Sequence, residues 1–394
     1  NHKSSPVFKS NILKKCTTLD LSVNNKNKIL HRLSMQAIHQ VNDYIDDIHI
    51  TWLKTRSHGV FPYCLKNYNQ SFNSINLKSK ITNLSLSDQH LFQRFGQGPI
   101  TRVPYRCIHH AFEANAKVNS DTIAVSHLDQ EITYKELNNK ANLLALELIK
   151  NGVKKGDNVG LFVQRSIPMV IGILAILKAG AAYVPQHIGL AKDKQLRYVI
   201  KSASINVILT LSEYKDLVPV LENRKHICID DFLTANNKPQ REIKLPNIKV
   251  TEDDICYIIF TSGTTGDPNG VQVTHRNTCN ILLTSPGNLG MRPGLKVGQI
   301  LSIAFDMSVW EILGCLANGA TLVIRGKNIQ ETVSKVDVVI STPTILSSLD
   351  IELCKNVRVA IVAGEPCPRI LAEKWSSFCA FHNSCGPTEI TIIN

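Results

Sequence analysis

From about Cys107 onward, short apolar runs alternate with amphipathic runs of helical length, and few folds accommodate this alternation. Asn158–Val163 is an apolar run of strand length, whereas Tyr134–Lys150 has the 3.6-residue periodicity of a helix. Near-continuous apolar strands separated by helices predict an α/β fold, with layered parallel sheets and flanking helices. The other expected strands are Thr122–His127, Val207–Thr210, Ile227–Asp230, Ile255–Phe260, Ala320–Ile324, Val336–Ile340 and Val357–Val362, and the other expected helices are His109–Lys117 and Ile167–Lys178.

The first 100 residues have a different character. They are rich in Asn, Ser and Lys, and they carry 13 Lys/Arg against 5 Asp/Glu, a net +8 of the chain's +12. One helix is expected over about Leu30–Trp52, and residues 66–88 have the composition of a polar linker. The sequence therefore predicts a poorly defined N-terminal region (1–80), a linker (81–106) and a folded core (107–394).

Composition excludes several classes of protein. Of the 394 residues, 43% are hydrophobic and 19% charged, which rules out a wholly disordered chain. No dense run of Lys and Arg is interleaved with aromatic residues, so no nucleic-acid partner is expected. The longest apolar run, Ile167–Leu177, is too short to span a bilayer, so no membrane partner is expected. The 11 cysteines include no C-x-x-C pair, which favours reduced thiols in a cytoplasmic protein over structural zinc.

The segment Ile258–Gly270 carries the strongest local signal. An apolar strand runs into a loop with four hydroxyl residues and two glycines, Thr261–Gly266. Glycines let the backbone approach an anion closely, and hydroxyls and exposed N–H groups can then hold phosphate oxygens. The spacing does not fit a Walker A loop. The segment predicts a phosphate-binding loop, although an ordinary strand-to-turn loop would use similar residues.

A second motif is Phe305–Glu311. Ser308 and Glu311 have the spacing of a capping box, which predicts that a helix begins at Ser308. Asp306, just before it, is open to two interpretations. It is either a carboxylate at a helix start or a carboxylate in a pocket wall that pairs with an ammonium group.

A third motif is Asn383–Glu389. Gly386 and Pro387 form a tight turn, and a hydroxyl and a carboxylate follow it as Thr388 and Glu389. A carboxylate beside a hydroxyl at such a turn could hold Mg²⁺ on a nucleotide. By itself this motif is weak, because an ordinary loop would look the same.

Together and in this order, the three motifs resemble the core motifs of adenylate-forming enzymes, most closely the adenylation domains of nonribosomal peptide synthetases. Ile132–Leu137 and Leu177–Pro185 are similar to two motifs that precede them in that family. The resemblance covers about Cys107–Asn394, and Ile81–Arg106 resembles the linker before such a domain. Residues 1–80 are open to interpretation as a remnant of a condensation domain, although no motif there indicates it.

The resemblance implies the large N-terminal part of an adenylate-forming enzyme and a reaction with ATP and Mg²⁺. Such domains join an amino acid to the α-phosphate of ATP and release pyrophosphate. The aminoacyl group then passes to a phosphopantetheine thiol on a carrier domain. The implied partners are therefore an amino acid and the carrier and condensation domains of a multidomain synthetase.

The resemblance also implies a role for individual residues. Thr388 would contact the α-phosphate, Glu389 would hold Mg²⁺, and Asp306 would pair with the substrate ammonium. The β- and γ-phosphates would be held by Thr261, Ser262, Gly263, Thr264, Thr265 and Gly266. The adenine would be bordered by Gly364, Glu365, Pro366, Asn383, Ser384 and Cys385. The rest of the substrate pocket would be Met307, Trp310, Ile340, Ile361, Ala363, Ser384, Ile392 and Ile393, an apolar wall that suggests a hydrophobic amino acid, although each apolar member also fits a plain core.

The chain departs from the family pattern in three places. Asn269 stands where the phosphate loop usually has Lys, Cys385 where an aromatic ring usually stacks on adenine, and His187 where an Asp is usual. The sequence given also stops after the third motif, so the small C-terminal lid and the carrier domain are expected to be absent and the fragment inactive alone. Two alternatives stay open: an acyl- or aryl-CoA ligase of the same superfamily, which Asp306 disfavours, and a catalytically dead nucleotide-binding domain.

Overall fold

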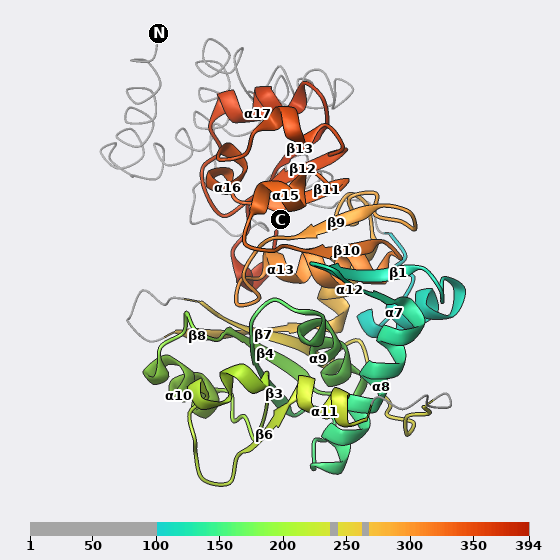
Figure 1. Ribbon diagram of the computed structural model, residues 1–394, viewed down its shortest axis with the longest axis vertical. Helices are drawn as coiled ribbons and strands as arrows, with labels where there is room; N and C mark the ends of the chain where they lie inside the picture. The colour runs from blue at the N-terminus through green and yellow to red at the C-terminus, as the bar shows by residue number, and fades with distance from the viewer. Residues whose placement is uncertain (1–100, 237–242, 262–267, 394) are drawn as a thin grey trace, which may run out of the picture. The chain divides into compact units, whose positions relative to one another are not determined.

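Two mixed β-sheets with flanking helices form the framework of the chain (Figure 1). The computed structural model describes residues 101–236, 243–261 and 268–393, which belong to one structural unit, Thr101–Asn394. The expected helix at Leu30–Trp52, the N-terminal region 1–80 and residues 81–100 of the linker 81–106 lie outside the described residues.

The seven-stranded sheet has the order β13-β12-β11-β9-β10-β1-β2. All neighbouring strands are parallel except β1 and β2, which are antiparallel. Its strands are β1 (Ile123–His127), β2 (Gln130–Thr133), β9 (Lys296–Gln299), β10 (Thr321–Ile324), β11 (Val338–Ser341), β12 (Val359–Val362) and β13 (Ala380–Asn383).

The six-stranded sheet has the order β6-β5-β3-β4-β7-β8. Here the antiparallel pair is β7 with β8, and the other neighbours are parallel. Its strands are β3 (Asn158–Val163), β4 (Ala182–His187), β5 (Val207–Thr210), β6 (Lys225–Cys228), β7 (Ile255–Thr261) and β8 (Asn269–Thr274). Parallel strands thus dominate both sheets, as the sequence predicts, and each sheet has one antiparallel pair at an edge.

Helices cover the sheets and supply much of the core. The longer ones are α7 (Ile108–Val118), α8 (Tyr134–Lys150), α9 (Ile167–Lys178), α10 (Asp193–Ser202), α11 (Ile229–Ala235), α12 (His275–Leu283) and α17 (Arg369–Ser376). Shorter ones are α13 (Met307–Val309), α14 (Cys315–Ala317), α15 (Ile329–Val333), α16 (Pro343–Ser347), the π-helical turn η3 (Trp310–Gly314) and the 3₁₀ turns η2 (Ser212–Leu217), η4 (Ile351–Cys354) and η5 (Thr388–Ile390).

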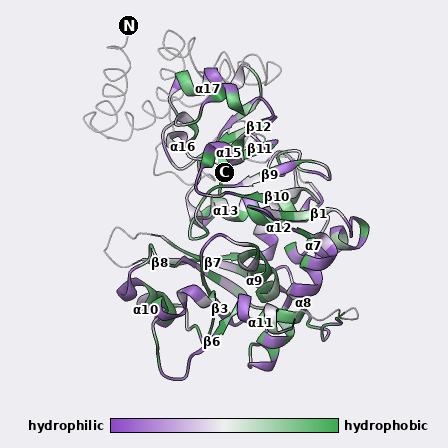
Figure 2. Cartoon of the chain, viewed as in Figure 1, coloured by the Kyte–Doolittle hydropathy of each residue, from purple (hydrophilic) through white to green (hydrophobic). Residues whose placement is uncertain are grey.

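Helix α9 is the most buried long helix of the described chain, and it appears as a hydrophobic ribbon in Figure 2. It packs against α8 and against β3 and β4, and of its residues only Pro168 is partly exposed. The hydroxyl of Ser166 accepts a hydrogen bond from the amide of Met169 and caps its start. The Lys178 ammonium at its end is buried and pairs with Glu113. None of the helices in the described ranges is both long and apolar enough to cross a bilayer.

One expected strand is partly wrong. We expect a strand at Ile227–Asp230, whereas β6 ends at Cys228 and α11 begins at Ile229. The Asp230 carboxylate accepts hydrogen bonds from the amide of Ser212, at 2.9 and 3.2 Å, and lies in the first turn of α11. An acidic side chain there stabilises a helix start. The strands β2, β4, β8, β9 and β13 are not predicted from the sequence, because they are short or contain Pro or polar residues.

Two buried histidines near the start of α7 make stability depend on pH. The ring centroids of His109 and His275 are 5.2 Å apart, and Nδ1 of His275 accepts a hydrogen bond from the amide of Ile108 at 3.4 Å. Burial, followed by the charge of His110, lowers the pKa of His275 from 6.5 to about 4, against the opposing charge of Asp254. Below pH 6.5 the unfolded chain therefore takes up a proton that the folded chain does not, and stability falls as the pH falls.

We predict that lowering the pH from 7 to 5 reduces the unfolding free energy of the wild type by about 2 kcal/mol more than that of His275→Asn. The Asn side chain can still accept from the Ile108 amide but does not titrate in this range. Urea unfolding of both chains at the two pH values measures the effect, and taking the difference cancels the other titrating groups. A pH-independent difference would contradict the prediction.

Candidate active site

Many of the residues singled out by the sequence lie where strands of the seven-stranded sheet end. Ile340 on β11 is in register with Ile361 on β12, and Ala363 and Gly364 follow β12 directly. Asn383 is the last residue of β13 and pairs with Val362. Crevices at the carboxyl ends of parallel strands are the usual ligand sites of open α/β sheets. The sheet topology therefore places those predicted adenine and substrate residues that lie on or just after β11, β12 and β13 near the carboxyl ends of these strands.

The apolar residues predicted for the substrate pocket belong to one buried cluster. Six of them are at most 3% exposed, whereas Ile393, which packs against the cluster, and Ser384 are partly exposed. The buried members are Met307, Trp310, Ile340, Ile361, Ala363 and Ile392. These residues come from four separate stretches of sequence, and Ile340 and Ile361 are in register on neighbouring strands.

Trp310 is held in one orientation. Its indole N–H donates a hydrogen bond to the carbonyl oxygen of Gly287 at 2.6 Å. Gly287 has no room for a side chain, because an added Cβ would lie 2.0 Å from the carbonyl oxygen of Ile281. On its own helix, a Cβ on Gly314 would lie 3.3 Å from Cδ1 of the indole. Two glycines thus permit the close packing around this ring.

Asp306 is a buried carboxylate at the start of α13, with 3% of its surface exposed. Burial raises the pKa of Asp306, hydrogen bonds from the Thr388 side chain and the Met307 backbone oppose this, and the charge of Glu389 adds to it. No ion pair to Asp306 occurs among the residues that the structure describes. The site therefore contains a desolvated acid without a cation from the described protein.

Tyr257 is a neighbour of this acid that is not predicted from the sequence. Its hydroxyl is buried and has no hydrogen-bond partner among the described atoms. Burial raises the pKa of Tyr257 well above its usual value, and the charges of Cys256 and Asp306 add to the effect. The phenol is therefore a neutral group near Asp306. Nothing in the apolar run of β7 distinguishes it from a core residue.

The capping box predicted for Ser308 and Glu311 is wrong. The short helix α13 already begins at Met307, and Glu311 is fully buried in the π-helical turn η3. Its carboxyl group accepts hydrogen bonds from the backbone amides of Ile300, at 2.8 Å, and Leu301, at 3.1 and 3.2 Å. The side-chain amide of Gln299 donates a further bond at 3.1 Å. The turn after β9 thus binds this carboxyl group, whose pKa burial raises to about 8.

The peptide that joins Ile300 to Leu301 is held from both sides. Its N–H points to Glu311, and its carbonyl oxygen accepts hydrogen bonds from Nη2 of Arg165 at 2.9 Å and Nε of Arg325 at 3.0 Å. Arg165 follows β3 and Arg325 follows β10, so the two cations come from different sheets. These contacts fix the segment that leads from β9 to Asp306.

Only the first residue of the predicted phosphate loop is described. Thr261 ends β7 and lies opposite Asn269, the first residue of β8, with its hydroxyl 3.5 Å from the Asn269 carbonyl oxygen. Ser262, Gly263, Thr264, Thr265 and Gly266 lie outside the described residues. The loop thus begins at the carboxyl end of a parallel strand, where phosphate sites of α/β folds commonly occur.

Thr388 and Glu389 open the 3₁₀ turn η5, and the Glu389 carboxylate is exposed. Thr391 and Ile392 come shortly after this turn, and each has a φ of 71°. Both side chains are β-branched, and such residues rarely adopt this left-handed region of backbone conformation. The Thr391 hydroxyl accepts a hydrogen bond from Asn277 at 3.3 Å. Backbone strain of this kind is concentrated at functional sites.

The donors present fit a magnesium ion that arrives with a nucleotide. Mg²⁺ is usually held by one or two carboxylates together with phosphate oxygens and water, and Glu389 offers one exposed carboxylate. Within the described ranges, no group of three or more His, Cys, Asp or Glu side chains could hold a metal by itself. A metal held here would therefore depend on ligands from the nucleotide.

The residues predicted to border adenine are mostly exposed. Gly364 has a φ of 84°, and an added Cβ would lie 3.4 Å from the Phe305 ring. The Glu365 carboxylate accepts a hydrogen bond from the Thr344 amide at 3.0 Å, and Thr344 lowers its pKa. Pro366, Asn383 and Cys385 are exposed, and Ser384 donates its amide to Val362 at 2.9 Å. This surface is open to a ligand.

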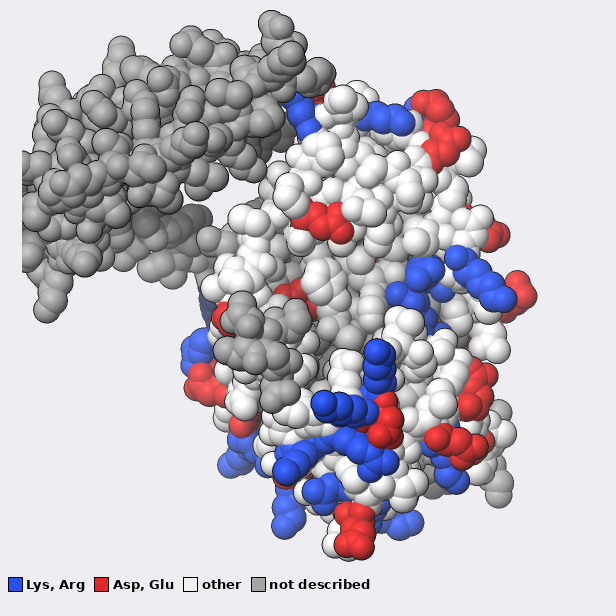
Figure 3. Space-filling model, turned by 90° about the vertical axis from the view of Figure 1, so that its left-hand side faces the viewer, with Lys and Arg blue, Asp and Glu red and all other residues white. Residues whose placement is uncertain are grey.

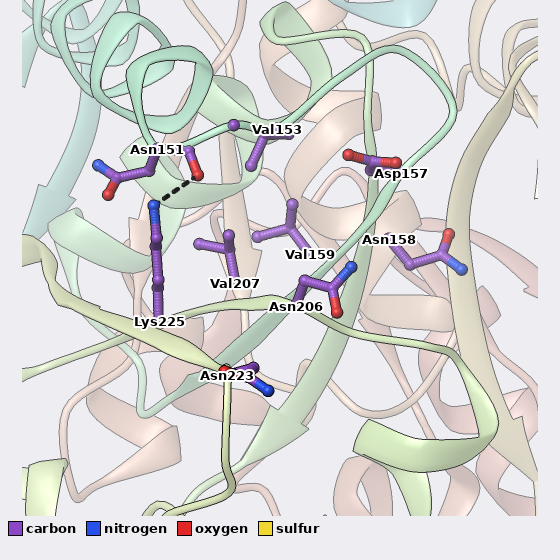
Figure 4. A pocket seen from close by; sticks show the side chains of 10 residues that line it. Asn151, Val153, Asp157, Asn158, Val159, Asn206, Val207, Asn223 and Lys225 are labelled. Atoms are coloured by element: carbon purple, nitrogen blue, oxygen red, sulfur yellow. Dashed lines mark hydrogen bonds between the residues drawn. The ribbon is translucent and has the colours of Figure 1, made fainter.

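A separate pocket of about 100 Å³ lies in the six-stranded sheet, at the end where its parallel strands begin (Figure 4). Asn158, Val207 and Lys225, which begin β3, β5 and β6, line it. The Lys225 ammonium donates to the carbonyl oxygen of Asn151 at 3.1 Å. The pocket is thus at the amino ends of the strands, away from the residues described above.

The fold is that of the N-terminal subdomain of adenylate-forming enzymes. The chain belongs to the AMP-binding enzyme family, whose model matches residues 112–394. The resemblance to adenylation domains inferred from the motifs is therefore confirmed.

Individual relatives agree with this assignment. Adenylate-forming reductase 06235 of Coprinopsis cinerea is 44% identical over 317 residues, which cover 80% of this chain and 31% of that protein. Tyrocidine synthase 1 of Brevibacillus parabrevis is 32% identical over 326 residues, covering 80% of this chain and 29% of that protein. The chain thus spans about a third of these relatives. The N-terminal subdomain of Klebsiella oxytoca NpsA has the same fold, with a TM-score of 0.65 and 24% identity over 73% of this chain and 77% of its own.

Proposed function

We propose that the chain is the part of a larger enzyme that activates an amino acid, with a hydrophobic side chain, as its aminoacyl adenylate. The carboxylate of the amino acid attacks the α-phosphate of ATP, the aminoacyl–phosphate bond forms, and pyrophosphate leaves. The observation that carries the proposal is the buried Asp306 carboxylate, which has no cation partner among the described residues.

A buried carboxylate is costly unless a positive group offsets its loss of hydration. The α-ammonium group of an amino acid would supply that charge, whereas a fatty or aryl acid has none. Met307 and Trp310, which follow Asp306 in the sequence, belong to the buried apolar cluster, and the charge that acts on Asp306 is the negative one of Glu389. We therefore assign Asp306 to the substrate ammonium and the apolar cluster to the substrate side chain.

The nucleotide would occupy the strand ends beside this pocket. Thr261 and the loop after it would hold the β- and γ-phosphates, Thr388 would contact the α-phosphate, and Glu389 would hold Mg²⁺. The exposed residues from Gly364 to Pro366 and from Asn383 to Cys385 would border the adenine. Positioning and charge neutralisation are what phosphoryl chemistry requires of a protein.

The further steps are also part of the proposal. The aminoacyl group would pass to the phosphopantetheine thiol of a carrier domain in the cytoplasm, with loss of AMP. Residues 107–394 would form the adenylating core, 81–106 the linker, and 1–80 a remnant of a condensation domain. The 44% identity to an adenylate-forming reductase favours a second arrangement, in which the activated acid is reduced rather than joined to a peptide. Both arrangements use the same adenylation step.

A matched pair of ligands tests the proposal on the 394-residue chain itself. Phenylalanyl sulfamoyl adenosine is an uncleavable analogue of an aminoacyl adenylate, and its 3-phenylpropanoyl counterpart lacks only the ammonium group. Calorimetric titration should give tighter binding of the phenylalanyl compound by roughly 100-fold or more, since a buried charge pair is worth about 3–5 kcal/mol. Equal binding would contradict an amino acid substrate, and no binding of either would favour a domain without adenylating function.

We also predict a preference for apolar side chains. Among the aminoacyl analogues, those of Phe, Leu or Val should bind more tightly than those of Lys or Glu, because burying an unpaired side-chain charge costs several kcal/mol. The comparison uses the same titration with analogues that differ only in the side chain. Tighter binding of a charged analogue would show that the apolar cluster around Trp310 does not line the pocket.

A further inference from the structure

Three basic side chains meet at the carboxyl ends of three strands. Arg165 follows β3, His187 ends β4, and Arg325 follows β10. Both guanidinium groups donate to the same carbonyl oxygen, that of Ile300, at 2.9 and 3.0 Å, so the two like charges are only a few ångströms apart. All three side chains are partly exposed. We call these residues the arginine cluster.

The arginine cluster has unused donors and an excess of positive charge. Neither arginine forms an ion pair with an acid among the described residues, and Nε of Arg165 is buried there without an acceptor. The acid whose charge acts on Arg165 is Glu311, which lies across the Ile300–Leu301 peptide and accepts hydrogen bonds from backbone amides. Since burial raises the pKa of Glu311 to about 8, it carries little of the compensating charge at neutral pH.

His187 does not supply the missing anion. Its Nδ1 lies 3.1 Å from the carbonyl oxygen of Ile188, and burial, followed by the charge of Arg165, lowers its pKa. The ring is therefore neutral at pH 7. Two guanidinium groups beside a neutral imidazole need an anion from outside the described protein, since like charges held together are costly.

Strand register places the arginine cluster beside the start of the phosphate loop. Val163 on β3 pairs with His187 on β4, and Tyr183 on β4 pairs with Tyr257 on β7. His187 and Thr261 each lie four residues beyond the pair of Tyr183 and Tyr257. They therefore end the neighbouring parallel strands β4 and β7 at the same level. Neighbouring strands are about 4.8 Å apart.

We propose that Arg165, Arg325 and His187 form a second phosphate-binding site, distinct from the loop after Thr261, that takes a phosphate or pyrophosphate group. Guanidinium groups match the geometry of phosphate oxygens and donate two hydrogen bonds at once. Two sources of such a group fit an adenylating enzyme: the pyrophosphate of ATP and the phosphate of a pantetheine arm. The shared chemistry is a phosphate dianion at the strand ends.

Calorimetric titration of the 394-residue chain at pH 7 tests the site, with pyrophosphate and 4′-phosphopantetheine as probes. The probe that binds more tightly identifies the source. Arg325→Gln should weaken that probe by roughly 10- to 100-fold, the range for a hydrogen bond to a charged group. Lys327→Gln removes the same charge from an exposed neighbour and should change little. Unchanged binding by Arg325→Gln, or no binding of either probe to the wild type, would overturn the proposal.

A second variant keeps the test independent of the hydrogen bond to Ile300. His187→Asp places a carboxylate in the arginine cluster, so it should compete with phosphate and weaken binding at least about tenfold. Its melting temperature without phosphate should equal or exceed that of the wild type, because the carboxylate supplies the missing charge. Wild-type phosphate affinity in His187→Asp would place the phosphate elsewhere and refute the site.

Discussion

Asp306→Ala should weaken binding of phenylalanyl sulfamoyl adenosine by roughly 100-fold or more and leave binding of the 3-phenylpropanoyl compound nearly unchanged. The reason is that only the first ligand carries the ammonium group that would offset the burial of this carboxylate. Titration of both compounds against wild type and variant completes a cycle that isolates this one interaction. An equal loss for both compounds would mean that Asp306 serves only the start of α13.

The same substitution should not destabilise the empty protein. Burial raises the pKa of Asp306, so the folded state disfavours its charged form, and above the usual pKa of an aspartate the group lowers stability. Asp306→Ala and Asp306→Asn should therefore unfold in urea at concentrations equal to or higher than those for the wild type at pH 7. Functional sites often retain such unfavourable groups.

Glu311→Ala is expected to have the largest effect on stability, a loss of about 3–5 kcal/mol in the unfolding free energy. The substitution leaves the buried amides of Ile300 and Leu301 without an acceptor, and each unsatisfied group costs about 1–3 kcal/mol. It also opens a cavity in η3. Urea unfolding at pH 7 measures the change.

Glu311→Gln is the matched control for this prediction. Gln has the same shape, keeps one acceptor oxygen for the amides and is uncharged, as the acid largely is at pH 7 when its pKa is about 8. Its loss of stability should therefore be well below that of Glu311→Ala. If Glu311→Ala and the wild type unfold at the same urea concentration, the bonds to Ile300 and Leu301 do not hold this turn.

The framework could be predicted because its signals are local. The bounds expected for Tyr134–Lys150, Ile167–Lys178 and Asn158–Val163 coincide with α8, α9 and β3, since apolar periodicity and capping residues determine them over short distances. The α8 start even shows the full capping box between Thr133 and Glu136. Short or polar strands such as β13 carry no such signal.

The details of the candidate site could not be predicted, because they depend on partners distant in sequence. The spacing of Ser308 and Glu311 fits a capping box, but the buried carboxyl group binds the turn after β9 instead. Likewise, nothing near Trp310 in the sequence indicates its bond to Gly287. The burial of Asp306 agrees with the pocket interpretation, and its role there remains a proposal.

The surface charges in Figure 3 also depend on the fold. Acidic and basic side chains are interspersed over much of the face shown, and Lys and Arg are densest in its lower half. Ion pairs of the described chain include those of Arg276 with Glu252 and Asp253. A net charge counted from the sequence therefore says little about the local field at any one site.

The bond from Arg165 to Ile300 has a mechanical consequence. Arg165 belongs to the loop after β3 of the six-stranded sheet, whereas Ile300 follows β9 of the seven-stranded sheet. Sliding one sheet past the other would break this hydrogen bond, at a cost on the order of 1 kcal/mol. At this point the hydrogen bond from Arg165 to Ile300 therefore opposes relative movement of the two sheets, and any such movement has to replace it with another contact.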